Sequence, residues 1–196
     1  SIVTDYITNS SISMSINLVT MIIANVIIFL IGCKLLNIKI PSLFMTEKFN
    51  GKTAVRYAII GIFLQITAGF IASVISSVIE NGFGITPYEA DFDMDPSDVK
   101  MIMITVLYTC IIAPVTEELL FRGFLLKAYS KASQRVGIFA TAFLFAIFHG
   151  NLSQGILAFI VGIFLATIVV RHNSLVPSII VHMSINTYAM INSFIY

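Results

Sequence analysis

Residues 100–126 read KMIMITVLYTCIIAPVTEELLFRGFLL, an apolar run that holds two adjacent glutamates and, one helical turn later, an arginine. The hydrocarbon core of a bilayer is about 30 Å thick, so a helix of about 20 apolar residues crosses it. A charged side chain at the centre of that core costs about 3 kcal/mol or more. The charges on Glu117, Glu118 and Arg122 therefore indicate an enzyme or an ion pathway inside the membrane.

The rest of the chain has the composition of an integral membrane protein. Of its 196 residues, 58% are hydrophobic and 11% are charged, and the mean hydropathy is +0.97. Because the linkers are too short for a second domain, we expect one membrane domain over residues 1–196. The apolar runs lie near residues 14–33, 55–79, 100–126, 136–150, 155–170 and 174–195. They predict an all-α fold, a polytopic transmembrane helical bundle of about six spans.

The charges between these runs alternate in sign from loop to loop. The basic loops carry Lys34, Lys39, Lys48, Lys52 and Arg56, then Lys127, Lys131 and Arg135, then Arg171, and the acidic second loop carries Glu80, Glu89, Asp91, Asp93, Asp95 and Asp98. Positive side chains accumulate in cytoplasmic loops, so we predict a multi-pass protein of the cell membrane with cytoplasmic basic loops and both termini outside. Nucleic acid is not expected as a partner, because the net charge is only +1 and the lysines flank membrane spans.

Two histidines fall at the same predicted depth as the glutamates. At about 1.5 Å of rise per residue, Glu117 lies about 15 Å from the cytoplasmic boundary, His182 about 17 Å and His149 about 21 Å. The three residues belong to three different predicted spans, numbers three, four and six. We therefore expect them to meet in one site. Pro114, three residues before Glu117, removes one backbone hydrogen bond and predicts a kink that opens space beside the carboxylates.

Helical spacing separates the roles of the polar residues. Glu118 and Arg122 are four residues apart, with the carboxylate nearer the N-terminus, which is the favourable order for an ion pair. Glu117 points about 100° away from Glu118 and has no cation of its own, which suits a general base or acid. His182 and Asn186 are also four apart, so both face one way and form a pair of hydrogen-bond donors.

These residue types suit peptide hydrolysis by water, in which a carboxylate and an imidazole deprotonate the water and donors stabilise the oxyanion. A zinc site is an open alternative, because Glu117, His149 and His182 form a His₂Glu set, although the sequence has no H-E-x-x-H motif. Among these residues, a purely structural role is most plausible for the Glu118–Arg122 pair, as a buried ion pair. Gly155 and Gly162, seven residues apart in the fifth span, predict close packing against a neighbouring helix.

At these residues the chain resembles the CPBP family of intramembrane proteases, which includes CAAX proteases and bacteriocin-processing enzymes and is also called the Abi family. The family motif E-E-x-x-x-R appears at Glu117–Arg122, F-x-x-x-H at Phe145–His149, and H-x-x-x-N at His182–Asn186. The resemblance covers residues 100–196, and the first two spans, at about 14–79, carry no motif.

The resemblance implies an endopeptidase in which Glu117 and His149 activate water, His182 and Asn186 stabilise the oxyanion, and Glu118 and Arg122 support the site. The family is often classed as metalloproteases, but its prenyl-protease branch is glutamate-dependent, so we expect no required cofactor and keep zinc as the alternative. The expected partners are the lipid bilayer and a peptide or protein substrate in the membrane, from CAAX-type, leader or pheromone processing. The other candidates are a non-proteolytic immunity or signalling scaffold and a proton-coupled transporter, although transport would favour internal symmetry, which the sequence lacks.

Overall fold

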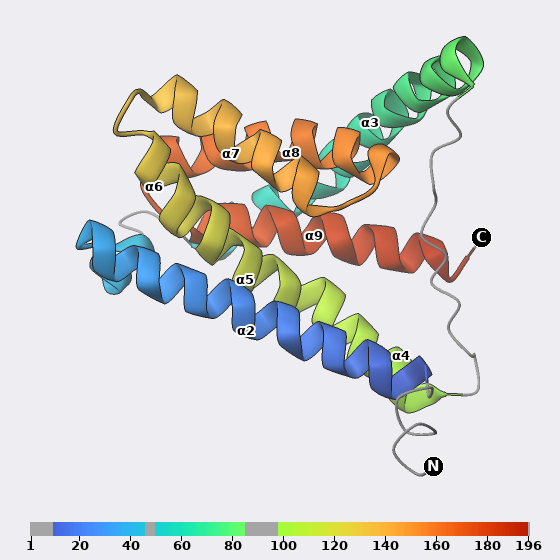
Figure 1. The fold of residues 1–196 in the computed structure, drawn as a ribbon, viewed down its shortest axis with the longest axis horizontal. Coiled ribbons are helices and arrows are strands. Elements are labelled where there is room, and N and C mark those ends of the chain that lie inside the picture. Colours follow the sequence, from blue (N-terminus) through green and yellow to red (C-terminus); the bar gives the residue numbers. More distant parts are fainter. Residues whose placement is uncertain (1–9, 46–49, 85–97, 196) are drawn as a thin grey trace.

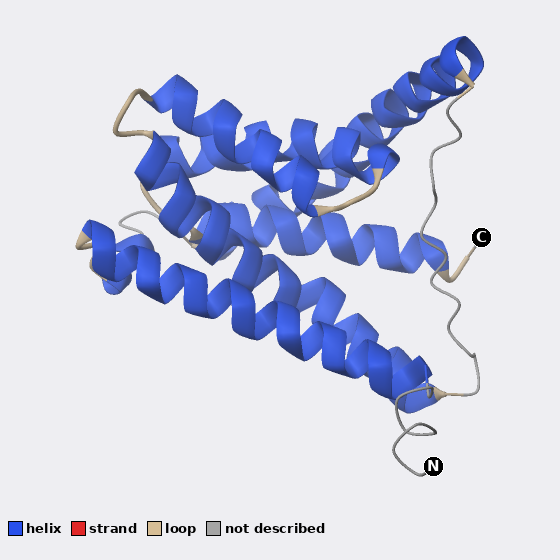
Figure 2. Cartoon of the chain, viewed as in Figure 1, coloured by secondary structure: helices blue, strands red, loops and turns tan. Residues whose placement is uncertain are grey.

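The computed structural model describes residues 10–45, 50–84 and 98–195, and within these ranges every long regular element is a helix (Figure 1; Figure 2). The helices are α2 Ser10–Leu36, α3 Gly51–Phe83, α4 Val99–Leu107, α5 Ala113–Glu118, α6 Leu126–Tyr129, α7 Gln134–Phe148, α8 Leu152–His172 and α9 Val176–Ser193, with a short 3₁₀ turn at Ile40–Leu43. Both ends of each predicted span lie within four residues of the corresponding ends of a helical segment. The predicted polytopic all-α bundle is therefore confirmed.

Four of the described segments are long and apolar enough to cross a membrane: Ser13–Leu36, Gly51–Phe83, Val99–Tyr129 and Leu152–His172. The helix α7 is apolar but shorter, with 15 residues, and α9 has 18. In Figure 1, α9 runs through the middle of the bundle, with α2 and the α4–α5–α6 segment on one side and α7 and α8 on the other. The motif-bearing helix α9 thus lies between the other two motif-bearing segments, α5 and α7.

The segment that carries the glutamates is a continuous helix with two wider turns. π-helical turns at Tyr108–Ile112 and Leu119–Leu125 flank the α-helical stretch α5. Pro114 lies near the start of α5, where its missing N–H removes one backbone bond, as the sequence predicted. Single π turns within α-helices are frequent at functional sites and bend a helix. The distortion therefore brackets Glu117 and Glu118 on both sides.

Glycines allow the close helix contacts that hold α7, α8 and α9 around the interior. A Cβ atom on Gly162 of α8 would lie 3.0 Å from the Cα atom of Ala142 in α7, and one on Gly155 would lie 3.2 Å from the carbonyl oxygen of Ala146. The close packing predicted from these two glycines is therefore confirmed. A Cβ on Gly61 of α3 would lie only 2.6 Å from the carbonyl oxygen of Val181 in α9.

The basic loops gather at one end of the bundle. The C-terminal ends of α2 and α6 and the start of α7 lie together at the left of Figure 1. The junction between α8 and α9 joins them, because the N–H of Leu175 donates to the carbonyl of Leu43 at 2.8 Å. Most of the acidic second loop, residues 85–97, lies outside the described residues, as does Lys48.

Candidate active site

A cavity of about 510 Å³ opens between α3, α5, α7, α8 and α9, and the predicted site residues lie on its wall. Its polar lining residues are Gln65, Tyr108, Thr109, Glu117, His149, Gln154, His182, Asn186 and Ser193. Four of the six residues that the sequence singled out therefore face one space, from three separate helical segments. The other two, Glu118 and Arg122, are fully buried behind the wall.

Glu118 and Arg122 form the ion pair that their spacing predicted. The Nη1 atom of Arg122 donates to Oε1 of Glu118 at 2.9 Å, and both side chains are 0% exposed. Arg122 also donates from Nη2 to the carbonyl oxygen of Gly162 in α8 at 3.3 Å. Removing one partner of such a pair is strongly destabilising, because the other charge stays buried. The pair thus fixes α5 against α8 beneath the cavity.

His182 of α9 lies between the two glutamates. Its Nδ1 atom is 3.1 Å from Oε1 of Glu118, and its Nε2 atom is 3.6 Å from Oε2 of Glu117. Since a carboxylate only accepts hydrogen bonds, Nδ1 is the donor to Glu118. This contact fixes the ring plane of His182 and leaves Nε2 on the side of Glu117. The helical spacing of the glutamates gave no sign of this cross-helix link.

Phe145 of α7 is the aromatic centre of the site. Its ring lies 4.4 Å from the guanidinium carbon of Arg122, and its centroid is 4.8 Å from that of His149 and 5.6 Å from that of His182, both in edge-to-face geometry. The ring is 1% exposed. Such cation–π and edge-to-face contacts are favourable. Phe145 therefore joins three motif residues.

The backbone of Phe145 also fixes the tautomer of His149. The Nδ1 atom of His149 is 2.8 Å from the carbonyl oxygen of Phe145, which only accepts, so Nδ1 carries the proton. In the neutral ring, Nε2 then carries the lone pair. His149 is half-buried and lines the cavity, so this lone pair is available to a water or a substrate group there.

Asn186 connects α9 to the first π-helical turn. Its Nδ2 group donates to the carbonyl oxygen of Thr109 at 2.9 Å. A π turn displaces backbone carbonyls from the regular α-helical ladder, which explains why this carbonyl accepts from a side chain. A carboxamide nitrogen has two N–H donors, so one remains for another acceptor in the cavity.

Comparison with known proteins agrees with these motifs. Residues 99–188 match the family model of type II CAAX prenyl endopeptidases, described as Rce1-like. This segment belongs to the Rce1-like family. The match begins at the first residue of α4 and ends in α9, so it contains all three motifs, whereas α2 and α3 lie outside it. No curated protein and no solved structure matches the chain.

The three-ligand zinc site that the sequence left open at Glu117, His149 and His182 stays a prediction. Among the residues that the structure describes, no three His, Cys, Asp or Glu side chains are placed to hold a metal ion together. The Nδ1 atoms of both histidines are hydrogen-bonded, one to the carbonyl of Phe145 and one to Glu118, which leaves Nε2 of each ring as the atom that a metal would use. Glu117, His149 and His182 share a cavity without forming a ligand set.

Sequence reasoning missed five polar residues of the cavity wall: Gln65 of α3, Tyr108 and Thr109 of the first π turn, Gln154 of α8 and Ser193 of α9. The signal for Gln65 was a carboxamide in the middle of an apolar span, where polar side chains face other helices or a cavity. Tyr108 stands nine residues before Glu117, and no helical periodicity connects the two across a π turn.

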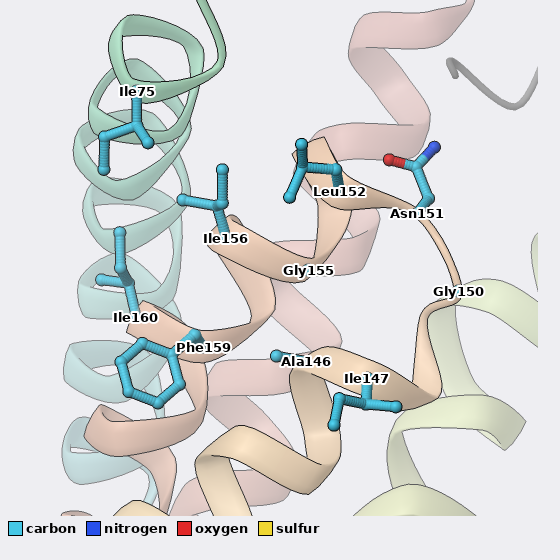
Figure 3. A pocket seen from close by; sticks show the side chains of 10 residues that line it. All are labelled: Ile75, Ala146, Ile147, Gly150, Asn151, Leu152, Gly155, Ile156, Phe159 and Ile160. Carbon is cyan, nitrogen blue, oxygen red and sulfur yellow. The ribbon is translucent and has the colours of Figure 1, made fainter. Parts of the chain in front are cut away.

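A second hollow, of about 580 Å³, lies between α3, α7 and α8 (Figure 3). Its wall is almost entirely apolar, with Ile75 from α3, Ile147 from α7 and Ile156 from α8 among the side chains that Figure 3 shows. Its polar side chain, Asn151, caps the N-terminus of α8 by accepting from the N–H of Gln154. This hollow has no group for acid–base chemistry, which leaves the Glu117 cavity as the candidate active site.

Proposed function

We propose that the protein is a membrane-embedded endopeptidase that hydrolyses a peptide bond of a CAAX-type prenylated protein, or of a leader or pheromone peptide, with water activated by Glu117. The observation that supports this best is the contrast between the adjacent glutamates. Glu118 is enclosed and paired with Arg122, whereas Glu117 lines the cavity next to the Nε2 atom of His182. Only Glu117 is therefore placed to meet a water and a substrate.

In this mechanism Glu117 is the general base. Its carboxylate takes one proton from a water bound in the cavity, and the hydroxide oxygen attacks the carbonyl carbon of the peptide bond. Glu117 then gives that proton to the departing nitrogen as the C–N bond breaks. A general base in a suitable position accelerates such a step about 10²- to 10⁴-fold. His149, with the lone pair of Nε2 free, orients the attacking water by accepting its second proton in a hydrogen bond.

His182 and Asn186 stabilise the oxyanion. Asn186 has one N–H beyond that bound to Thr109, and a protonated His182 has an Nε2–H beside Glu117. In this form the ring donates from both nitrogens, from Nδ1 to Glu118 and from Nε2 to the oxyanion.

The mechanism uses no metal, and the Glu118–Arg122 pair acts as support for His182. The basic end of the bundle, formed by the ends of α2 and α6, is the cytoplasmic end in our proposal, with both chain termini outside. A scaffold without proteolysis is the second candidate. It would explain the buried ion pair equally well, but not the arrangement of Glu117, His149 and Asn186 around a cavity.

The proposal is tested with the purified protein in liposomes and a farnesylated CAAX peptide that carries a fluorophore and a quencher on opposite sides of its cysteine. We expect a rise in fluorescence, two fragments whose masses identify one hydrolysed bond, and no loss of rate with 1,10-phenanthroline. Two results together would reject the endopeptidase in favour of the scaffold. The first is that this peptide is not cleaved, and the second is that cells expressing wild type and cells expressing Glu117→Gln contain the same membrane peptides.

A further inference from the structure

Gln65 stands on the face of α3 that points into the bundle. The buried residues of α3 follow a helical period on that face: Gly61, Ala68, Ala72 and Ser76. Gln65 lies within this series, one turn after the crossing point where Gly61 approaches the carbonyl of Val181. It is the long polar side chain in a row of small ones, and it lines the cavity that contains Glu117.

The side-chain oxygen of Gln65 is not used to hold helices together. Its Oε1 atom is buried, and none of the described residues supplies a hydrogen-bond donor to it. Buried polar atoms in proteins are almost always paired, and an exception calls for an explanation, such as a water or a ligand that pairs with the atom. Interhelical hydrogen bonding, the usual role of a polar residue in a membrane span, therefore does not account for Gln65.

The substrate of an endopeptidase in this cavity needs such a partner. A peptide bond can be attacked only where the substrate is extended, and an extended segment has N–H and C=O groups without intrachain partners. Bulk water is excluded from the membrane interior, so the protein must supply most of those partners. A carboxamide has the same donor and acceptor groups as a peptide unit and can pair with it from the side.

We propose that Gln65 binds the main chain of the extended substrate beside the bond that is cut, with its side-chain oxygen accepting from a substrate N–H. This inference rests on the proposed function and adds to it, because it places part of the substrate site on α3, outside the Rce1-like segment 99–188. Gln65 does not touch the reacting atoms in this role. It positions the substrate and contributes to the KM value.

The first test compares Gln65→Leu with the matched control Thr67→Val on the farnesylated fluorogenic peptide. Thr67 lies two residues away on the exposed side of α3 and bonds to the carbonyl of Phe63 in its own helix at 2.8 Å. For Gln65→Leu we expect a KM value about three- to tenfold higher, the effect of one hydrogen bond, with kcat nearly unchanged. Thr67→Val should match wild type in both.

Thermal unfolding separates substrate binding from a structural role. Leucine removes a buried oxygen without a partner, so Gln65→Leu should unfold at the same temperature as wild type or higher. A lower unfolding temperature together with a proportional loss of kcat would show that Gln65 supports the fold, and would overturn the proposal.

A second test identifies the substrate N–H. In a series of farnesylated peptides, each amide near the cut, except the cut bond itself, is replaced by an ester, which removes one N–H donor. One ester should raise the KM value of wild type by the same factor as Gln65→Leu, and should have no further effect on Gln65→Leu. If every ester affects the two proteins equally, Gln65 does not bind the main chain.

Binding measurements keep the two proposals separable. The affinity of the farnesylated peptide is measured by fluorescence anisotropy for Glu117→Gln and for Glu117→Gln with Gln65→Leu. We expect about three- to tenfold weaker binding by the double variant. Equal affinities, including no measurable binding by either protein, overturn the role of Gln65. If Glu117→Gln abolishes cleavage while Gln65→Leu changes nothing, only the Gln65 proposal fails. Cleavage that survives Glu117→Gln rejects the proposed function itself.

Discussion

The Nδ1 atom of His182 lies 3.1 Å from Oε1 of Glu118, and the same oxygen accepts a hydrogen bond from Arg122 at 2.9 Å. A continuous chain of hydrogen bonds therefore runs from Arg122, which contacts α8, through Glu118 to His182 on the cavity wall. The buried pair fixes the imidazole, and the imidazole presents Nε2 beside Glu117. This contact connects the supporting residues of the proposed mechanism to its reacting residues.

Arg122→Met should destabilise the fold, because it leaves the carboxylate of Glu118 buried without its cation. We expect a loss of about 3 to 5 kcal/mol in the free energy of unfolding, measured by denaturant titration in detergent micelles. The double variant Arg122→Met with Glu118→Gln removes both charges and should recover part of that loss. If both variants have the same free energy of unfolding as wild type, the Glu118–Arg122 pair does not support the bundle.

Phe145→Leu should weaken the site more than Phe143→Leu, its matched control on the same helix. The ring of Phe145 contacts Arg122, His149 and His182, whereas Phe143 is 58% exposed. Loss of the cation–π contact and of ring packing should cost about 1 to 3 kcal/mol of stability and reduce kcat, while Phe143→Leu stays near wild type. The account of Phe145 fails if both variants have the same unfolding midpoint and the same rate.

Asn186→Ala should lower kcat and leave the KM value nearly unchanged, since it removes a donor that acts on the oxyanion and not on the bound peptide. Loss of one oxyanion donor typically lowers kcat about 10²- to 10³-fold. Asn192→Ala, at an exposed position near the end of α9, is the control. A rise in the KM value at constant kcat would assign Asn186 to substrate binding.

Gly162→Val should separate α7 from α8 and disturb Arg122, whose Nη2 group donates to the carbonyl of Gly162. The added carbons would meet Ala142, which lies about 3.0 Å from the position of a Cβ atom. Overpacking of this kind costs about 1 to 3 kcal/mol. Gly69→Ala is the matched control, since a Cβ there meets nothing within 4 Å, and it should stabilise α3 slightly. Equal unfolding midpoints for the two variants would contradict the close α7–α8 contact.

The sequence predicted the bundle because a hydrophobic run long enough to cross a membrane forms a helix there, where its backbone hydrogen bonds are satisfied within the segment. It also predicted the Glu118–Arg122 pair, since an i, i+4 contact within one helix depends only on helical geometry. The convergence of Glu117, His149 and His182 on one cavity followed from depth counted along three separate spans. These features depend on local geometry or on the thickness of the bilayer.

The remaining features depend on how the helices rotate against each other. His182 and Glu118 are 64 residues apart, and no spacing rule predicts which glutamate the imidazole meets. The π turns at 108–112 and 119–125 have no sequence signature. The hydrogen bond from Asn186 to the carbonyl oxygen of Thr109 could therefore not be predicted. Gln65 reaches the cavity only because Gly61 allows α3 to cross α9 closely.

In the proposed mechanism Glu117 is the base that activates water, and the decisive measurement is the kcat of the Glu117→Gln variant. The measurement uses the farnesylated fluorogenic peptide in liposomes, with Glu80→Gln as the control, since Glu80 is an exposed glutamate of α3. We expect kcat to fall about 10²- to 10⁴-fold in Glu117→Gln, with an unchanged unfolding midpoint and wild-type activity in the control. A Glu117→Gln protein that cleaves the peptide at the wild-type rate would exclude Glu117 as the base.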